Sequence, residues 1–202
     1  MKDEGIIKFN CNWEKSGPLP ADLIKDINNW RGKLYRAGLI GENADGIGYG
    51  NISIRLKENK FIVSGSATGK LEELSGEHYT IVTGFDLGQN SLTTVGPVRA
   101  SSESLTHAVI YESQKDVNAV MHIHHFQLWK KLLDTFPATS RAVEYGTTAL
   151  AKEIQRLFRE TELSAQRIFA MGGHEDGIIS FGKNTEEAGQ LIFGQLIQLQ
   201  QE

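Results

Sequence analysis

The sequence predicts an α/β protein with a largely antiparallel sheet flanked by helices. Apolar residues recur at helical spacing near the start, from about Pro20 to Leu39, and again after Asn184. Between these two segments lie several short stretches with the alternating or β-branched composition of strands. The strands cluster and do not alternate regularly with helices, so a parallel sheet of βαβ units is not expected.

The first half of the chain begins with a helix and continues into strands. The predicted helix has one apolar face, formed by Leu23, Ile27, Trp30, Leu34 and Ala37. Gly38 and Gly41 are typical of a helix end. Polar and apolar residues then alternate through Asn51–Leu56, as in a half-buried strand. Further short strands are predicted at 61–63 and 79–83, with a loop at 64–76 between them.

The second half is predicted to contain three helices and three strands in mixed order. Ser102 is a suitable N-cap for a helix over residues 103–113, and a strand follows at 119–124. A helix at 149–158 and two strands at 168–171 and 177–181 come next. Asn184 caps the last helix, with Glu187 in capping-box register. No repeat or linker interrupts the chain, so residues 1–202 are predicted to form a single domain.

Composition excludes several classes of function. The 21 basic and 25 acidic residues give a net charge of −4, which disfavours nucleic acid and anionic membranes as partners. Cys11 is the one cysteine, so neither an intrachain disulfide nor a cysteine-rich zinc site can form. No stretch is long and apolar enough to span a bilayer. Met1–Ile7 has no secretory character, so a cytoplasmic protein is expected.

Three of the six histidines lie together in Met121-His-Ile-His-His125. Because side chains alternate along a strand, His122 and His124 share one face while Met121 and Ile123 point to the core. Two imidazoles so placed can share one metal ion, and catalytic zinc commonly takes three protein ligands. The alternative is a pair of surface histidines on an edge strand. His125 points the other way and is expected to be a supporting or surface residue.

A third ligand must come from elsewhere in the chain. His174 lies in Gly172-Gly-His-Glu-Asp-Gly177, a glycine-rich turn that permits unusual backbone angles and close approach. Glu175 and Asp176 are rival ligands in the same turn. Three histidines with an optional carboxylate suit zinc best, although manganese, cobalt or iron would fit nearly as well.

Glu103 begins the predicted helix and is the candidate carboxylate. Acidic residues in a first turn often only stabilise the helix dipole, and at this position the carboxylate is not expected to be buried deeply in the core. His107, four residues on, either orients Glu103 or simply packs. Ser101 and Ser102, with the N–H groups of the helix start, would suit a phosphate or a carboxylate. Gly50-Asn51 and the loop at 64–69 are expected to supply further hydrogen-bond donors.

Taken together, these features resemble the class II aldolase/adducin family, which includes fuculose-phosphate aldolases and ribulose-phosphate 4-epimerases. The resemblance rests on Gly48–Arg55, Phe61–Gly69, Ser101–Tyr111 and Asp116–His124, and it extends from the first long helix to Gly182. Gly173-His174 followed by Asp176-Gly177 resembles the family's Asn-His-Gly turn with two residues inserted. The resemblance implies a three-layer αβα fold with a mainly antiparallel sheet, and a homotetramer with sites at subunit interfaces.

The resemblance also implies roles for individual residues. His122, His124 and His174 match the metal ligands, and Glu103 matches the catalytic acid/base. Gly50, Asn51, Ser101 and Ser102 match phosphate-binding positions. The loop at 64–69 carries an extra residue, which leaves open whether Ser66 or Thr68-Gly69 completes the phosphate site.

The expected function is a metal-dependent lyase of the aldolase type. It would act through an enediolate on a small hydroxy-carbonyl compound, such as a sugar phosphate. The alternatives are a sugar-phosphate epimerase or dehydratase of the same family, and a non-catalytic adducin-like interaction module. The resemblance implies two catalytic tyrosines, one in the region that corresponds to 126–145 and one in a longer C-terminal tail. Here the region 126–145 is short, and only a helix follows Gly182.

Overall fold

A computed structural model describes residues 6–201 as one eight-stranded sheet, one two-stranded sheet and six α-helices. The large sheet has the order β1-β7-β6-β5-β4-β8-β10-β9 and is antiparallel except for the pair β1–β7, so the predicted mainly antiparallel sheet is confirmed. Its strands are β1 (Asn10–Lys15), β4 (Asn51–Lys57), β5 (Lys60–Ser64), β6 (Tyr79–Asp86), β7 (Ser91–Gly96), β8 (Ala119–His124), β9 (Ile168–Ala170) and β10 (Gly177–Gly182). β2 (Gly41–Glu42) and β3 (Gly48–Tyr49) form the small sheet.

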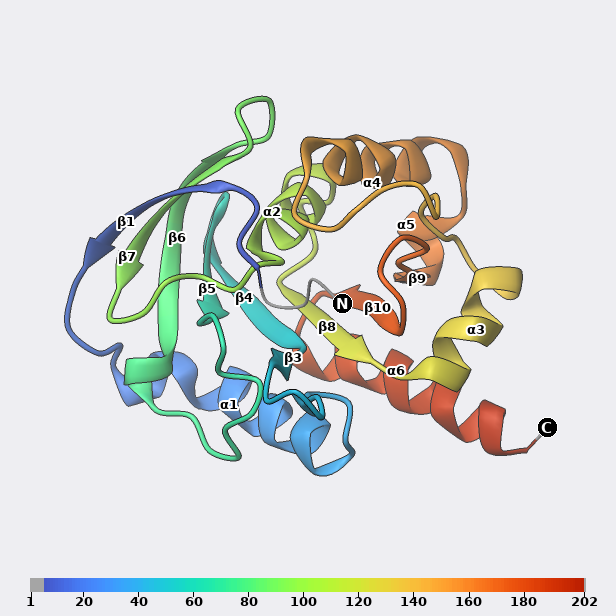
Figure 1. The fold of residues 1–202 in the computed structure, drawn as a ribbon, viewed down its shortest axis with the longest axis horizontal. Helices are drawn as coiled ribbons and strands as arrows, with labels where there is room; N and C mark the ends of the chain where they lie inside the picture. The colour runs from blue at the N-terminus through green and yellow to red at the C-terminus, as the bar shows by residue number, and fades with distance from the viewer. Residues whose placement is uncertain (1–5, 202) are drawn as a thin grey trace.

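Helices cover both faces of the large sheet, as the predicted three-layer fold requires (Figure 1). One layer contains α1 (Ala21–Arg36), α3 (Phe126–Thr135) and α6 (Thr185–Gln200), and the other contains α2 (Ser104–Ser113), α4 (Thr148–Glu160) and the short α5 (Leu163–Gln166). Each layer has its own apolar core. Trp30, Leu132 and Ile192 belong to the first core, whereas Val109 and Ile154 belong to the second.

The long helices follow the apolar pattern of the sequence. α1 buries Ile27, Trp30 and Leu34, as its spacing predicts. The prediction was wrong at Leu23 and Ala37, which are exposed; Ile24 is buried in place of Leu23. The Asn184 side chain accepts a hydrogen bond of 2.8 Å from the Glu187 N–H and caps α6, which confirms that prediction. Burial of these faces against the sheet is the main favourable term that fixes the layers.

Several elements differ from the prediction. The polar strand β1, strand β7 and helix α3 were not predicted. β1 lies at the edge of the sheet and buries no residue fully; only Cys11 and Trp13 alternate with polar residues, a pattern too short to indicate a strand. The prediction that Ser102 caps the helix was wrong. α2 begins at Ser104 with Glu103 at the N-cap position, and no side chain caps it.

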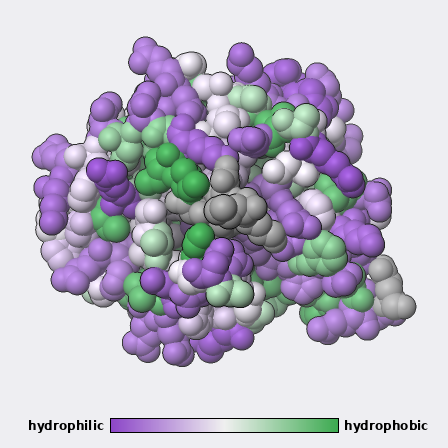
Figure 2. Space-filling view, viewed as in Figure 1, coloured by the Kyte–Doolittle hydropathy of each residue, from purple (hydrophilic) through white to green (hydrophobic). Residues whose placement is uncertain are grey.

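The face seen in Figure 2 is mostly hydrophilic, with hydrophobic residues in small separate patches. Among residues 6–201, no helix is long and apolar enough to cross a bilayer. The prediction on a secretory signal rests on residues 1–7, of which 1–5 lie outside the described residues.

Candidate metal centre

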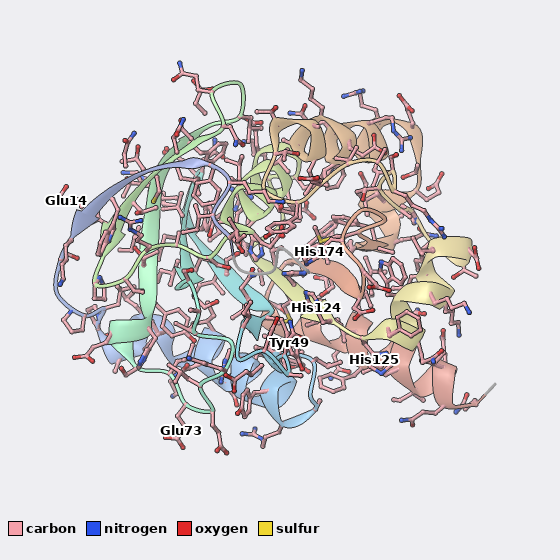
Figure 3. The ribbon with its side chains drawn as sticks, viewed as in Figure 1. Glu14, Tyr49, Glu73, His124, His125 and His174 are labelled. Carbon is pink, nitrogen blue, oxygen red and sulfur yellow. The ribbon has the colours of Figure 1, made fainter. Side chains whose placement is uncertain are left out.

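Three histidines from two parts of the chain meet at the end of β8. His122 and His124 come from β8, and His174 comes from the turn between β9 and β10. One nitrogen of each ring lies within 4.8 Å of the others, and the Nε2 atoms of His124 and His174 are 3.2 Å apart. Figure 3 shows His124 and His174 close together near the middle of the molecule, with His125 set apart. Glu175 and Asp176, the rival ligands, are not part of this group.

Strand alternation brings His122 and His124 to one face of β8. The intervening Met121 and Ile123 lie in the apolar core on the opposite face. β8 is a central strand, paired with β4 on one side and β10 on the other, so the alternative of an exposed edge strand was wrong. His122 is only 1% exposed.

The turn that carries His174 is shaped by its glycines. A Cβ on Gly172 would lie 2.1 Å from the Thr139 carbonyl oxygen, and one on Gly173 would lie 2.0 Å from that of Val143. Only glycine permits such close packing. Two hydrogen bonds close the turn, from His174 N–H to the Met171 carbonyl (3.1 Å) and from Gly177 N–H to the His174 carbonyl (3.0 Å). The turn therefore holds His174 at a fixed place beside β8.

The donor set fits a divalent transition metal. Tetrahedral nitrogen ligands about 2.1 Å from a zinc ion lie roughly 3.4 Å apart, close to the 3.2 Å between His124 and His174. The Nε2 atom of His122 is buried and has no hydrogen-bond partner among the described residues. Gly177 leaves the space open: a Cβ there would lie 2.4 Å from a His174 ring carbon and 3.3 Å from His122 Nε2.

Asn51 contacts the other nitrogen of His122. Asn51 and His122 are directly opposed on β4 and β8, and the Asn51 amide nitrogen lies 3.2 Å from His122 Nδ1. Both side chains are buried, and Asn51 Oδ1 has no partner among the described residues. Turning the amide by about 180° exchanges its oxygen and nitrogen. The oxygen then accepts from His122 Nδ1–H, and Nε2 keeps its lone pair for a metal.

The electrostatics of the site also favour neutral imidazole. Burial lowers the pKa of His122 well below its ordinary value, and the neighbouring His124 and His174 lower it further. Because metals bind the unprotonated ring, this shift keeps His122 ready for a metal at neutral pH.

Helix α2 lies over the same sheet face as the histidines. His107 on α2 accepts or donates a 2.7 Å hydrogen bond with Ser53 on β4, and Ser53 shares its strand face with Asn51. At the start of α2, a Cβ on Gly146 would lie 3.5 Å from the Ser102 carbonyl oxygen. The preceding residue, Tyr145, packs against the His174 ring with centroids 4.8 Å apart. The segment at 145–146 therefore joins the start of α2 to the histidines.

Glu103 is more deeply buried than the sequence predicts. A position at the start of a helix was expected to keep its carboxylate near the surface, but the residue is only 2% exposed. The expectation failed because the start of α2 is covered by the segment around Gly146. Glu103 Oε2 accepts a hydrogen bond of 2.7 Å from the Thr106 hydroxyl, which orients the carboxylate.

His107 belongs to a buried polar network. Ser53 Oγ lies 2.7 Å from His107 Nδ1 and 2.8 Å from the Tyr111 hydroxyl. Burial lowers the pKa of His107 to about 3, so the ring is neutral over the physiological range. These bonds tie α2 to β4.

Two aromatic residues have places that the sequence did not indicate. Tyr145 is 4% exposed and lies between His174 and Lys8, whose ammonium is 4.2 Å from the Tyr145 ring centroid. No local pattern marks Tyr145, since its position results from the path of the 137–147 segment. His125, which was expected to support the site or lie on the surface, is half-buried, and its Nδ1 accepts from the Leu128 N–H and caps α3.

Of the predicted phosphate-binding residues, Gly50 and Asn51 lie against His122, and Ser101 and Ser102 lie on the segment that leads into α2. Gly50 has φ +76°, and a Cβ there would lie 3.1 Å from the His122 carbonyl oxygen. Ser101 and Ser102 are 6% and 7% exposed and directly precede Glu103. The Ser66 N–H donates to the Arg99 carbonyl (2.9 Å), which brings the loop at 64–69 next to the serines.

A scan against protein-family models matches residues 39–194 to the Class II Aldolase and Adducin N-terminal domain. The match spans most of the chain and includes every predicted site residue. The chain belongs to this family. The family's typical dependence on a divalent metal agrees with a histidine group that could hold one. No curated protein sequence matches the chain significantly.

Solved structures of class II aldolases share the fold. L-fuculose-1-phosphate aldolase from Thermus thermophilus is 21% identical, with a TM-score of 0.65 over 90% of this chain and 92% of that one. A sugar-phosphate aldolase from Thermotoga maritima is 15% identical, with a TM-score of 0.66 over 89% and 92%. A putative aldolase/epimerase/decarboxylase from Klebsiella pneumoniae is 17% identical, with a TM-score of 0.65 over 89% and 87%. At these identities the likeness concerns the fold.

Proposed function

We propose that the protein is a metal-dependent lyase of the aldolase type, acting on a small hydroxy-carbonyl compound with sugar phosphates as the first class to test. The observation that carries the proposal is the group formed by His122, His124 and His174, whose ring nitrogens lie within 4.8 Å of one another. Membership of an aldolase family supports an enzyme of this kind at a coarse level. Zinc is the proposed metal because neutral imidazoles in tetrahedral sites suit it.

When bound, the ion would act as a Lewis acid that polarises a substrate carbonyl and stabilises negative charge developing beside it. Three neutral histidines would hold the ion, and Asn51 would keep the proton of His122 on Nδ1. This assignment gives Asn51 a supporting role at the metal in addition to its predicted place at the phosphate site. It is supported by the 3.2 Å contact between the Asn51 amide and His122.

Glu103 is the proposed acid/base. Its carboxylate would take a proton from the substrate and return it to the product, a role that requires a fixed orientation and exclusion of bulk water. The Thr106 hydroxyl at 2.7 Å and the 2% exposure of Glu103 support both requirements.

The phosphate of a substrate would lie toward Gly50, Ser101 and Ser102. Gly50 lies against the His122 backbone, Ser101 and Ser102 directly precede Glu103, and the loop at 64–69 lies against the segment that precedes the serines. We further propose that residues 1–202 form one domain, that the chain assembles as a homotetramer, and that it is cytoplasmic. Light scattering that reports a monomer at micromolar concentration would exclude the tetramer.

Metal analysis and a substrate panel test the function. We expect the purified chain, incubated with zinc and desalted, to retain about one ion per chain. A panel of ketose and aldose phosphates and their dephosphorylated forms is then assayed for cleavage, epimerisation and dehydration. Cleavage supports the lyase; epimerisation or dehydration alone favours the other enzymes of the family. Absence of bound metal would favour an interaction module instead.

Glu103→Gln distinguishes catalysis from packing. The variant keeps the size of the side chain but cannot carry a proton, so turnover should fall on the order of a hundred- to ten-thousand-fold while metal binding stays. Glu112→Gln is the matched control, because Glu112 lies on the exposed end of the same helix. A Glu103→Gln enzyme with bound metal and wild-type turnover would show that Glu103 is not the acid/base.

A further inference from the structure

Arg31 is a buried cation that contacts the backbone of a loop. It lies on α1 and is 2% exposed. Its guanidinium donates to three carbonyl oxygens, of Glu72 at 2.6 Å, Thr68 at 3.2 Å and Gly69 at 2.8 Å. A buried charge is costly unless its hydrogen bonds are satisfied, so these bonds hold the loop firmly against α1.

The bonds to two successive carbonyls also orient two successive N–H groups. In a trans peptide, the C=O of one residue and the N–H of the next point in opposite directions. Because the carbonyls of Thr68 and Gly69 point at Arg31, the N–H groups of Gly69 and Lys70 point away from it. Adjacent N–H groups that face the same way form a backbone site for an anion.

These two N–H groups lie beside Gly48, which has no side chain to cover them. A Cβ on Gly48 would lie 3.0 Å from the Lys70 nitrogen and 3.2 Å from the Gly69 nitrogen. Neither N–H donates a hydrogen bond within the part of the chain that the structure describes. Gly48 is three residues from Asn51, which spans at most about 10 Å. Since Asn51 contacts His122, one small substrate could reach from these N–H groups to the metal centre.

We propose that Arg31 is a positioning residue that holds the Thr68–Lys70 backbone in the conformation that binds the anionic end of the substrate. The inference rests on the proposed function and selects Thr68-Gly69, not Ser66, as the edge of the phosphate site. Arg31 acts from behind the loop, because its three bonds go to carbonyl oxygens and leave the N–H groups for the anion.

A cavity gives solvent access to this guanidinium. It has a volume of about 700 Å³ and lies between α1 and residues 72–76, with Arg31, Asn28 and Leu74 in its lining. The Asn28 side chain donates to the Leu74 carbonyl at 2.6 Å, so the same helix holds the loop at a second point. A small cation could enter through the cavity and occupy the place of a truncated Arg31 side chain.

The test measures phosphate binding and metal binding separately. Inorganic phosphate is titrated calorimetrically into the full chain at pH 8, both zinc-loaded and after chelator treatment, so that phosphate on the metal is distinguished from phosphate on the loop. Arg31→Lys keeps the charge but cannot span three carbonyls. We expect its phosphate affinity to fall about tenfold or more, with zinc affinity unchanged. Arg36→Ala is the control, since Arg36 lines the same cavity from an exposed position.

Chemical rescue distinguishes positioning from a merely structural role. Arg31→Ala should lose phosphate affinity and regain part of it in millimolar guanidinium, which should not help the wild type or Arg36→Ala. If Arg31→Ala does not fold, Arg31→Lys decides. Wild-type phosphate affinity in Arg31→Lys would overturn the proposal, and so would a wild-type chain that binds zinc but no phosphate. Failure to bind zinc would instead refute the proposed function, while the chelator-treated titration still decides the role of Arg31.

Discussion

The two faces of β8 differ sharply in chemistry although both are buried. On one face, Ala119, Met121 and Ile123 lie in the apolar core beneath α1 and α6. On the other face, Val120 packs in the second apolar core, but His122 is buried beside the polar side chains of Asn51 and His107. Apolar burial stabilises the fold, whereas polar burial costs stability unless hydrogen bonds or a ligand compensate.

Within β8, this contrast separates the residues that stabilise the fold from His122, which is proposed to act in chemistry. Within residues 6–201, the buried atoms without a hydrogen-bond partner include His122 Nε2, Asn51 Oδ1 and His107 Nε2, all on the α2 side of the sheet. A metal would satisfy the first of these atoms. The buried polar groups around His122 therefore lower the stability of the metal-free protein, and a bound metal would offset part of that loss.

The largest effects are expected from substitutions of two neighbouring residues of β8, one on each face of the strand. His122→Ala should abolish retention of zinc after desalting, because it removes one of three ligands. Ile123→Ala should keep zinc and lower the free energy of unfolding by about 2–5 kcal/mol, because it opens a cavity in the apolar core. Elemental analysis and urea unfolding measure the two effects. If both variants lost metal and stability to the same extent, the division of roles between the faces would be wrong.

A smaller effect is expected at Asn51, which supports the metal ligand without binding the metal. Asn51→Ala should weaken zinc affinity roughly 10- to 100-fold, the usual cost of removing a partner that orients a histidine ligand. Competition with a chelator of known affinity measures it. Asn43→Ala is a suitable control, since Asn43 lies outside the large sheet. Unchanged zinc affinity in Asn51→Ala would mean that the contact with His122 does not fix the ring.

The smallest expected effect concerns the pH dependence of the metal-free protein. The pKa of His107 is about 3 in the fold and near 6.5 in an unfolded chain, so acid protonates the unfolded state first. Stability from this group is therefore full above pH 6.5 and is lost as the pH falls toward 3. Between pH 7.5 and 5 the loss should be on the order of 1–2 kcal/mol. Urea unfolding after chelation should show this loss in the wild type and a shallower dependence in His107→Gln. Equal slopes in both proteins would contradict it.

Much of the site could be predicted because its signals are local. His122 and His124 are two residues apart on a strand, and alternation alone brings them to one face. The glycine-rich turn around His174 and the helix cap at Asn184 are likewise local. The roles proposed for Glu103, Ser101 and Ser102 came from the resemblance to a family, since their local signals are weak.

The sequence by itself therefore determined the class of fold, the two long outer helices and the histidine pair, because the periodicity and spacing of side chains follow from backbone geometry. Only the tertiary structure decided the depth of Glu103, the place of Tyr145 beside His174 and the bonds from Arg31 to the loop. Each of these depends on contacts between segments far apart in the chain. Arg31, for example, is 37 residues from Thr68 and 38 from Gly69, and nothing in either local pattern indicates that they meet.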